Sequence, residues 1–284
     1  MKNKLSLIVS LLALASFLPL TACGQGGGDK KKKDVEVKCP SGIDHSAWDG
    51  LLKKYVDEKG LVNYSAWKAD AGDMKALDGY LKQFAAKPDK AAEGNEKAAS
   101  LVNAYNALAI RTILGAYPVE SIHEVDKPFE TKKWQIGGET VSLNDIENGT
   151  LRPMLKYRAH AALVCAARSC PPLQRTAYSA DSFEAQDDKA YTTWLGREDL
   201  NKFMPDKNKA EISEIFKWFK GDFEKSLSVP KVLQQYGPPA AKELTKGGDK
   251  FEVSYLSYNW GLNDQGEHGR HYSKINLIFD KLGE

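Results

Sequence analysis

The chain has 284 residues and an almost even charge balance, with 40 Lys and Arg against 38 Asp and Glu. A nucleic-acid-binding protein would carry a basic excess, so no nucleic-acid partner is expected. The length fits one large domain or two small ones, and the 10% of aromatic residues supports a substantial core.

The N-terminal residues have the pattern of an exported lipoprotein. Two lysines precede an apolar run over residues 5–20, which is shorter than the roughly 20 residues needed to cross a bilayer. The run ends in the tetrapeptide LTAC at residues 20–23, which resembles the lipobox recognised by bacterial lipoprotein signal peptidase. We therefore expect residues 1–22 to be a signal peptide and Cys23 to carry lipid after cleavage.

Residues 23–40 are expected to be the lipidated cysteine and a flexible tether. Their sequence begins with GQGGGDKKKK after Cys23, and glycines and like charges cannot bury enough surface to fold. More than one acyl chain makes anchoring stable, so the expected partner is a lipid bilayer. The expected location is the cell envelope, facing the periplasm or the exterior. Gly24, in place of an Asp, favours the outer membrane in a cell with two membranes.

Three segments in the first half of the globular part, residues 41–284, have helical periodicity. In residues 44–56 the apolar side chains Trp48, Leu51, Leu52 and Tyr55 follow the spacing of one helix face. The same spacing recurs over residues 77–84, and residues 96–117 form the longest candidate helix, which Pro118 ends.

The following elements mix strand and helix patterns. Residues 133–141 predict a hairpin around two glycines, and Ser142 or Asn144 can cap a helix through Leu155. The short apolar run over residues 160–165 predicts a buried strand. Further segments are expected as helices (residues 181–197 and 209–220) and a strand (residues 251–258). This order indicates a single α+β domain, with helices packed around a small mixed or antiparallel sheet.

The globular part contains an odd number of cysteines. If Cys23 is lipidated, Cys39, Cys165 and Cys170 remain, so at least one thiol is free or paired with another molecule. The thiol is either buried and inert or reactive, and composition alone favours the inert alternative.

The densest group of reactive side chains lies in residues 158–172, which include His160, Cys165 and Cys170. A thiolate nucleophile needs a lowered pKa and a base that takes its proton. On one unbroken strand, His160 and Cys165 would point to opposite faces, so they form a dyad only if the strand breaks or one of them pairs elsewhere. The alternatives are a core histidine, a buried cysteine and a Cys165–Cys170 disulfide. That disulfide requires the chain to turn within residues 166–169, because five extended residues span about 17 Å.

Three further polar residues could form part of a site. Asn103 and Asn106 lie on one face of the long apolar helix, where a buried amide must find partners. They either tie the helix to a loop or position groups in a site. Glu147 is a candidate partner, or else a solvated surface charge.

No cofactor or metal is expected. Glu267, His268 and His271 do not match the H-E-x-x-H spacing. The sequence also contains no dinucleotide-binding, Walker or G-x-S-x-G motif.

Several motifs, in order, resemble the DUF547 family over residues 48–263. They are Asn103-Ala-Tyr-Asn106-Ala-Leu, Ser121-Ile, Leu143-Asn-Asp-Ile-Glu147, Arg158-x-His160-x-Ala-Leu-x-Cys165, Ser169-Cys170-Pro-Pro-Leu and Tyr258-Asn-Trp260-x-Leu-Asn263. Asn259 departs from the acidic residue usual before that tryptophan.

The resemblance implies a bacterial lipoprotein member of a family that is defined by sequence and has no assigned function. Asn103, Asn106, Glu147, His160 and Cys165 fall on its motif positions. Plant relatives often carry Ser where Cys170 stands but retain Cys165, so the resemblance favours Cys165 as the nucleophile and argues against an obligatory Cys165–Cys170 disulfide.

The resulting hypothesis is a membrane-anchored thiol enzyme that hydrolyses or transfers an acyl or amide group. Cys165 would be the nucleophile and His160 the base or orienting group, with Glu147, Asn106 and Asn103 as the other site residues. Its substrates would be peptides or peptidoglycan-derived fragments. The alternative is a non-catalytic envelope module in which the same residues bind a partner or hold the fold together.

Overall fold

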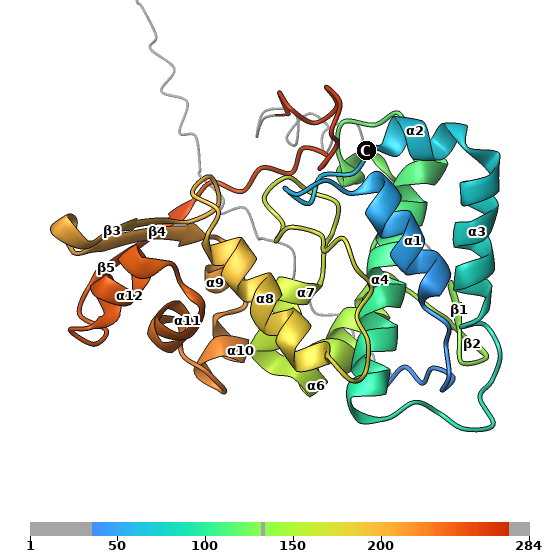
Figure 1. The fold of residues 1–284 in the computed structure, drawn as a ribbon, viewed down its shortest axis with the longest axis horizontal. Helices are drawn as coiled ribbons and strands as arrows, with labels where there is room; N and C mark the ends of the chain where they lie inside the picture. The colour runs from blue at the N-terminus through green and yellow to red at the C-terminus, as the bar shows by residue number, and fades with distance from the viewer. Residues whose placement is uncertain (1–35, 132–133, 273–284) are drawn as a thin grey trace, which may run out of the picture. The chain divides into compact units, whose positions relative to one another are not determined.

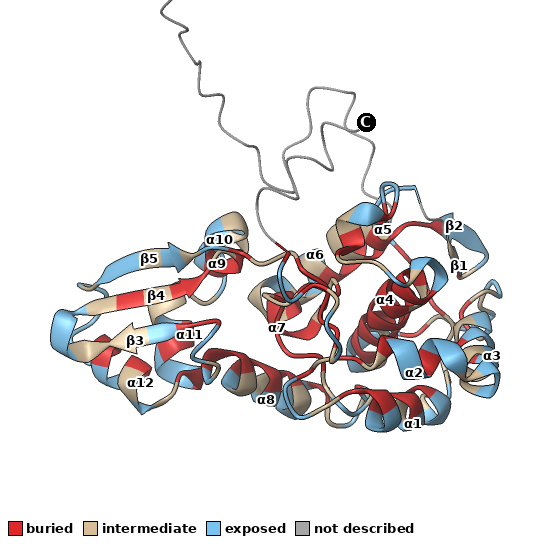
Figure 2. Ribbon diagram, turned by 90° about the horizontal axis from the view of Figure 1, so that it is seen from above, coloured by how far each residue is buried: buried red, intermediate tan, exposed pale blue. Residues whose placement is uncertain are grey.

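The long helix predicted around residue 100 is the most buried element of the fold. The computed structural model describes residues 36–131 and 134–272, so Cys23, the expected signal peptide and most of the expected tether lie outside the described residues. Helix α4 (Gly94–Ala116) is buried along most of its length (Figure 2). Its C-terminal half is apolar on nearly every face, which is typical of a helix enclosed by others.

Three shorter helices lie beside α4, as Figure 1 shows. Helix α1 (Ser46–Tyr55) buries Trp48, Leu51, Leu52 and Tyr55, the four side chains of the predicted face. The others are α2 (Tyr64–Ala69) and α3 (Ala71–Lys82). Helices α2 and α3 pack on α4, and α1 packs on α3 and α2. The Asp70 side chain accepts from the Asp73 backbone N–H and so caps the start of α3.

The packed chain already begins within the segment expected to be a tether. Val37 and Cys39 are both buried. The Val37 backbone N–H donates to the Thr150 hydroxyl, and the Ala92 backbone N–H donates to the Cys39 carbonyl. These contacts fix the entry of the chain into the fold.

The predicted hairpin and its capped helix are both present. Strands β1 (Trp134–Ile136) and β2 (Glu139–Val141) pair antiparallel across two glycines with positive φ. Ser142 then forms a capping box with Asp145 at the start of α5 (Leu143–Ile146). The chain stays helical through the π-helix η2 (Glu147–Leu151) and α6 (Arg152–Leu155). The 3₁₀-helices η1 (Ile122–Glu124) and η3 (Lys156–Arg158) flank this region.

The second half of the chain builds a mixed sheet with helices beside it. Strand β4 lies between β3, its antiparallel partner, and β5, its parallel partner. The strands are β3 (Lys202–Met204), β4 (Lys209–Ser213) and β5 (Glu252–Leu256). The helices are α7 (Ala159–Ala162), α8 (Phe183–Leu195), η4 (Pro205–Lys207), α9 (Ile215–Trp218), α10 (Lys220–Glu224), α11 (Val229–Tyr236) and α12 (Pro239–Thr245).

Two predicted elements are wrong. The run expected as a strand over residues 160–165 begins as helix α7 and becomes extended only from Leu163. Alanine is the best helix former, and a short apolar run does not distinguish a strand from a helix by periodicity. Residues 209–213, expected as helix, form strand β4, because Ala210 and Ile212 alternate into the core while β5 pairs alongside.

The predicted fold class is confirmed. Helices pack with a three-stranded mixed sheet and a two-stranded antiparallel hairpin, and the described residues, 36–131 and 134–272, form one compact unit. Within the described ranges, no helix is both long and apolar enough to span a membrane.

Candidate functional site

A reversing loop follows α7 and carries both Cys165 and Cys170. Ala166 adopts a left-handed φ of 65°, and the Cys170 backbone N–H donates to the Ala167 carbonyl at 3.1 Å. The chain therefore turns within residues 166–169, as a contact between the two cysteines requires. Backbone strain of this kind clusters at functional sites.

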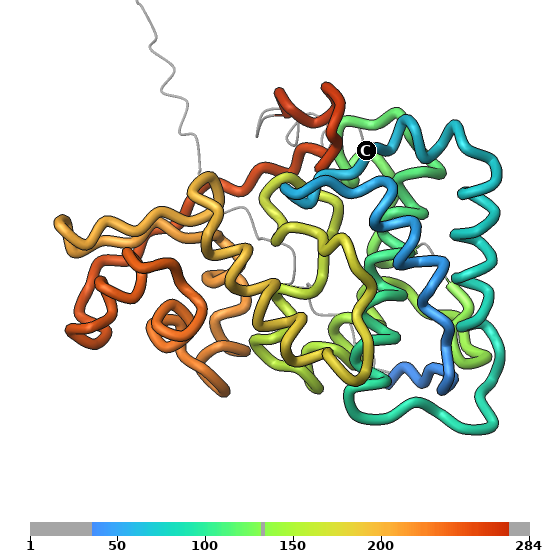
Figure 3. The backbone as a smooth tube through the Cα atoms, viewed as in Figure 1, coloured from blue at the N-terminus to red at the C-terminus, as the bar shows by residue number. Residues whose placement is uncertain are grey.

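Two distant segments hold this loop. Residues 259–263 pair with it along the backbone: Arg168 N–H donates to the Gly261 carbonyl at 2.7 Å, and Asn263 N–H to the Ala166 carbonyl at 2.9 Å. Figure 3 lets the reader follow how this late segment of the chain returns to the loop. On the other side, the Asn106 amide donates to the Ala162 carbonyl and accepts from the Val164 N–H, both at 2.9 Å.

Asn103 makes the same double contact with a different loop. Its amide donates to the Tyr178 carbonyl at 2.8 Å and accepts from the Tyr178 N–H at 2.9 Å. The two asparagines of α4 thus each fix a backbone segment, and Asn106 fixes the segment that leads into Cys165.

The two thiols lie together beside Tyr258. The Tyr258 hydroxyl is 3.6 Å from Cys165 Sγ and 3.1 Å from Cys170 Sγ. The Cys165 backbone N–H donates to Cys170 Sγ at 3.2 Å. Cys170 is 5% exposed, whereas Cys165 is only partly buried. Cys165 is therefore the sulfur that solvent or a substrate can reach more easily.

The thiols titrate as a pair. The hydrogen bond with Cys170, followed by burial, raises the pKa of Cys165. Burial also acts against ionisation of Cys170, but the hydrogen bonds from Cys165 and the Tyr258 hydroxyl outweigh it and lower the pKa of Cys170. The first proton lost leaves one negative charge and one proton between the two sulfurs.

Glu147 lies at the first position of the π-helix. Its Oε2 accepts from the Tyr105 hydroxyl at 2.9 Å, and burial raises the pKa of the carboxyl. The pKa of Tyr105 is raised by burial and then by the charges of Glu147 and Cys165. Tyr105 therefore lies near the charges of both Glu147 and Cys165. Short π-helices occur frequently at functional sites.

His160 belongs to a neighbouring ion-pair group. Its Nε2 is 2.9 Å from Asp222 Oδ2, and Arg152 Nε donates to the same oxygen at 2.8 Å. The ring stacks on Phe219 with centroids 4.2 Å apart. Within residues 36–131 and 134–272, no hydrogen bond joins His160 to Cys165.

The charges of this group follow from its environment. Burial lowers the pKa of His160, which is therefore held neutral. Burial opposes ionisation of Asp222 too, but the hydrogen bonds from His160 and Arg152 lower its pKa to about 2. A neutral imidazole beside a carboxylate carries its proton on Nε2, which donates to Asp222. The Nδ1 atom is then the basic nitrogen.

An aromatic cluster adjoins the thiols through Tyr258. The Tyr258 ring centroid is 4.8 Å from that of Trp218 and 4.6 Å from that of Trp260. The two tryptophans are partly exposed and stack at 5.9 Å with an interplanar angle of 14°. The cluster forms an apolar surface next to Cys165.

Sequence reasoning missed Tyr105, Tyr258 and Asp222 as members of this region. Tyr105 and Tyr258 lie inside the motifs quoted above, so their positions carried a signal. Asp222 lies in α10, where no sequence pattern marked it, and it meets His160 only because the chain folds back across 62 residues.

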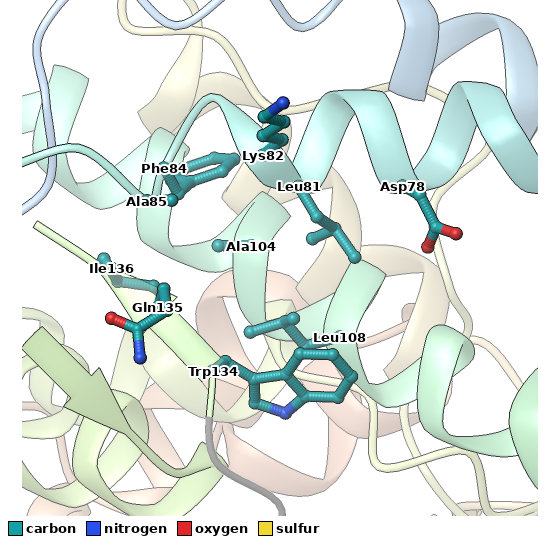
Figure 4. A pocket seen from close by; sticks show the side chains of 10 residues that line it. All are labelled: Asp78, Leu81, Lys82, Phe84, Ala85, Ala104, Leu108, Trp134, Gln135 and Ile136. Atoms are coloured by element: carbon teal, nitrogen blue, oxygen red, sulfur yellow. The ribbon is translucent and has the colours of Figure 1, made fainter. Parts of the chain in front are cut away.

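A cavity of about 220 Å³ lies elsewhere, among α3, α4 and β1. Figure 4 shows its mainly apolar lining, with Trp134 beside Leu108. It shares no side chain with the thiol region. Among the described residues, no group of three or more His, Cys, Asp or Glu side chains could hold a metal ion. The Nδ1 of His268 lies 2.7 Å from Glu120 Oε1.

Comparison with known proteins gives one match. A family model described as "Protein of unknown function, DUF547" matches residues 89–195. No curated protein and no solved structure matches the chain. The matched range runs from just before α4 to the end of α8, and it contains Asn103, Asn106, Glu147, His160 and both thiols of the loop. The chain therefore carries a DUF547 domain, over residues 89–195.

Proposed function

We propose that this protein is a thiol-dependent enzyme that hydrolyses or transfers an acyl or amide group, with Cys165 as nucleophile. The observation that carries the proposal is the thiol pair itself. Two sulfurs share the Tyr258 hydroxyl, and the more exposed one precedes a left-handed residue. A structural cysteine needs neither the shared charge nor the strained loop.

In the first step, the thiolate of Cys165 attacks the carbonyl carbon of the substrate. Because the pKa of Cys170 is the lowered one, the charge of the ionised pair moves to Cys165 only as the Cys165 proton passes to Cys170. The bond from the carbonyl carbon to the leaving nitrogen or oxygen then breaks, and a thioester forms on Cys165. Water or an acceptor amine attacks the thioester, releases the product and restores the thiolate.

Glu147 is the proposed acid. Because burial raises its pKa, its carboxyl holds a proton at higher pH than an ordinary glutamate, and it can give that proton to the leaving group. It recovers a proton from the attacking water or amine. His160 orients this region through Asp222 and Arg152, and Asn106 positions the Cys165 loop.

The proposed setting is the cell envelope, with the chain anchored through lipid on Cys23. The lipobox-like LTAC and the Gly/Lys-rich stretch that follows support this. A tethered thiol enzyme would meet peptides or peptidoglycan-derived amides near the membrane. The cluster of Trp218, Tyr258 and Trp260 offers these substrates an apolar contact beside the thiols.

The first test is timed iodoacetamide labelling of the purified full-length protein in detergent, read by peptide mass spectrometry across a pH series. We expect the thiol pair to label in the native state with an apparent pKa below the roughly 8.5 of a free cysteine. Cys39 is an internal control, since it is fully buried and burial raises its pKa to about 11. It should label only in denaturant.

Tyr258→Phe should raise the apparent pKa of the pair by about 1–2 units, because a hydrogen bond to a charged group contributes about 1.5–3 kcal/mol. The matched control is Tyr178→Phe, whose buried hydroxyl has no hydrogen-bond partner among the described residues. It should leave labelling unchanged. If the thiols of the wild-type protein react only after unfolding, the proposal is wrong.

A second test uses p-nitrophenyl acetate as the acyl donor. Acylation of Cys165 should release a burst of nitrophenolate equal to the amount of enzyme. Cys165→Ser should abolish the burst, whereas Cys39→Ser should retain it. An undiminished burst from Cys165→Ser would rule Cys165 out as the nucleophile.

One observation favours the non-catalytic alternative. Asn103 and Asn106 use both ends of their amides on backbone groups, which is how a binding or structural module would use them. A protein with unreactive native thiols that still binds envelope material would fit that alternative.

A further inference from the structure

We infer that Cys165 and Cys170 are a redox-modification site, at which the two thiols reversibly form a disulfide by exchange with the disulfide of another molecule. Both sulfurs lie within 3.6 Å of one hydroxyl, and the Cys165 backbone N–H donates to Cys170 Sγ. They are reduced in this structure. The structure thus brings together two thiols that the sequence separates by four residues.

The backbone between them already has the turn that a disulfide needs. The left-handed Ala166 and the hydrogen bond from Cys170 N–H to the Ala167 carbonyl reverse the chain. The Cys170 sulfur lies against the backbone of Cys165, whose N–H donates to it at 3.2 Å. Bond formation therefore requires the side chains to rotate, while the pairing of the loop with residues 259–263 can stay in place.

The same contacts make the disulfide easy to reduce. A disulfide across so short a segment gains little from constraining the unfolded chain. The Tyr258 hydroxyl and the Cys165 N–H stabilise a thiolate, which exists only in the reduced state. Stabilising the reduced form raises the reduction potential, which is the property of reversible rather than structural disulfides.

The unequal exposure of the sulfurs assigns their order of reaction. The charge of the ionised pair moves to the more exposed Cys165 as its proton passes to Cys170, and the Cys165 thiolate attacks one sulfur of the incoming disulfide. The other half leaves as a thiolate and takes the proton from Cys170. The thiolate of Cys170 then attacks Cys165 Sγ and expels the second half. The two protein thiols lose two electrons in total, and the incoming disulfide is reduced to two thiols.

Only the expected effect of the disulfide on activity rests on the proposed function. With Cys165 in a disulfide, no thiolate is available to attack an acyl group, so oxidation would switch the enzyme off. The chemistry of the disulfide itself does not depend on catalysis.

The experiment equilibrates the purified full-length protein in a series of glutathione buffers, from reduced to oxidised. The free thiols are then trapped with N-ethylmaleimide, and the peptides are mapped. We expect a peptide cross-linked through Cys165 and Cys170 to appear cooperatively, while Cys39, which is fully buried, stays reduced. Dithiothreitol should reverse the change.

Two variants sharpen the test. Cys170→Ser should stop at a glutathione adduct on Cys165, because the resolving thiol is missing. Tyr258→Phe should form the disulfide in more reducing buffer, with about a tenfold change in the midpoint equilibrium ratio, which equals about 30 mV for a two-electron couple. Tyr178→Phe is the matched control and should leave the midpoint unchanged.

A wild-type protein that keeps both thiols free in oxidised buffer, or accumulates a stable glutathione adduct instead, would overturn the inference. The outcome is separable from that of the proposed function. A disulfide that forms in a protein without an ester burst supports the redox site and refutes the enzyme. A burst that oxidation leaves unchanged supports the enzyme and refutes the redox site.

Discussion

Asp187 is a carboxyl that the fold buries completely. Its Oδ2 accepts from Arg158 at 2.9 Å, but its Oδ1 has no hydrogen-bond partner among the described residues. Burial raises the pKa of Asp187 to about 7, against the opposing charge of Arg158. The residue lies in α8 and outside the thiol region, so its effect should appear in stability.

The stability of the fold should therefore fall as the pH rises from about 4 to about 7. In this window the folded state keeps the Asp187 proton while the unfolded chain releases it, so the slope is at most about 1.4 kcal/mol per pH unit. Asp187→Asn should remove this contribution, and the difference from wild type in the free energy of unfolding should change steadily across the window. Urea denaturation at a series of pH values measures it.

The control is Asp70→Asn, which keeps an N-cap on α3. The pKa of Asp70 is lowered by the Asp73 backbone N–H and by Lys54, so Asp70 is ionised in both states above about pH 5. Above that pH, the free energy of unfolding of Asp70→Asn should change with pH in parallel with that of the wild type. If the free energy of unfolding of Asp187→Asn also changes with pH in parallel with that of the wild type, the Asp187 carboxyl is ionised in the folded protein.

At the scale of elements, helix α4 is linked to two different loops by one type of contact. Asn106 fixes residues 162–164, and Asn103 fixes Tyr178, each with one donated and one accepted hydrogen bond. The two asparagines are therefore a natural matched pair, because they share residue type, burial and helix.

Each alanine variant should cost about 2–4 kcal/mol of unfolding free energy, since each leaves a buried donor and a buried acceptor without partners. Only Asn106→Ala should alter the rate of iodoacetamide labelling of Cys165, because only Asn106 holds that loop. Equal changes in labelling from both variants would mean that general loosening of the fold, rather than the Asn106 contact, controls the thiol.

Element prediction failed at residues 160–165 because a short apolar run fits a strand and a helix equally well. Residues 160–165 were expected as a strand on apolar content, but the alanines around His160 form a helix that ends at Ala162. The argument that His160 and Cys165 lie on opposite strand faces therefore does not apply. They are separated because a helix end and a turn lie between them, and His160 packs on Phe219 and Asp222 instead.

At the scale of the whole molecule, the anchor remains a prediction. Cys23→Ser should move the protein from the membrane fraction to the soluble fraction. Two or more acyl chains anchor a protein stably, and the variant lacks the cysteine expected to carry them. Phase separation in Triton X-114 measures the change. Cys39→Ser is the control and should stay with the membrane, and equal partitioning of the two variants would exclude Cys23 as the lipid site.

The sequence by itself determined what depends on neighbouring residues. The spacing of Trp48, Leu51, Leu52 and Tyr55 predicted the buried face of α1, and the apolar run after residue 96 predicted α4. The two glycines and Ser142 predicted the hairpin and the helix cap that follows. Periodicity, turn chemistry and capping act over a few residues, so they can be seen in one stretch of chain.

Only the tertiary structure decided which chemical groups meet. Cys170 and Tyr258 lie 88 residues apart in the sequence, yet their side chains are 3.1 Å apart. Cys165 and His160 are sequence neighbours by comparison, but they bind different partners. Contacts between distant segments are fixed by how the whole core packs, and no local pattern encodes them. For that reason the sequence named Cys165 and left its pairing with Cys170 as one alternative, whereas only the fold placed both thiols beside Tyr258.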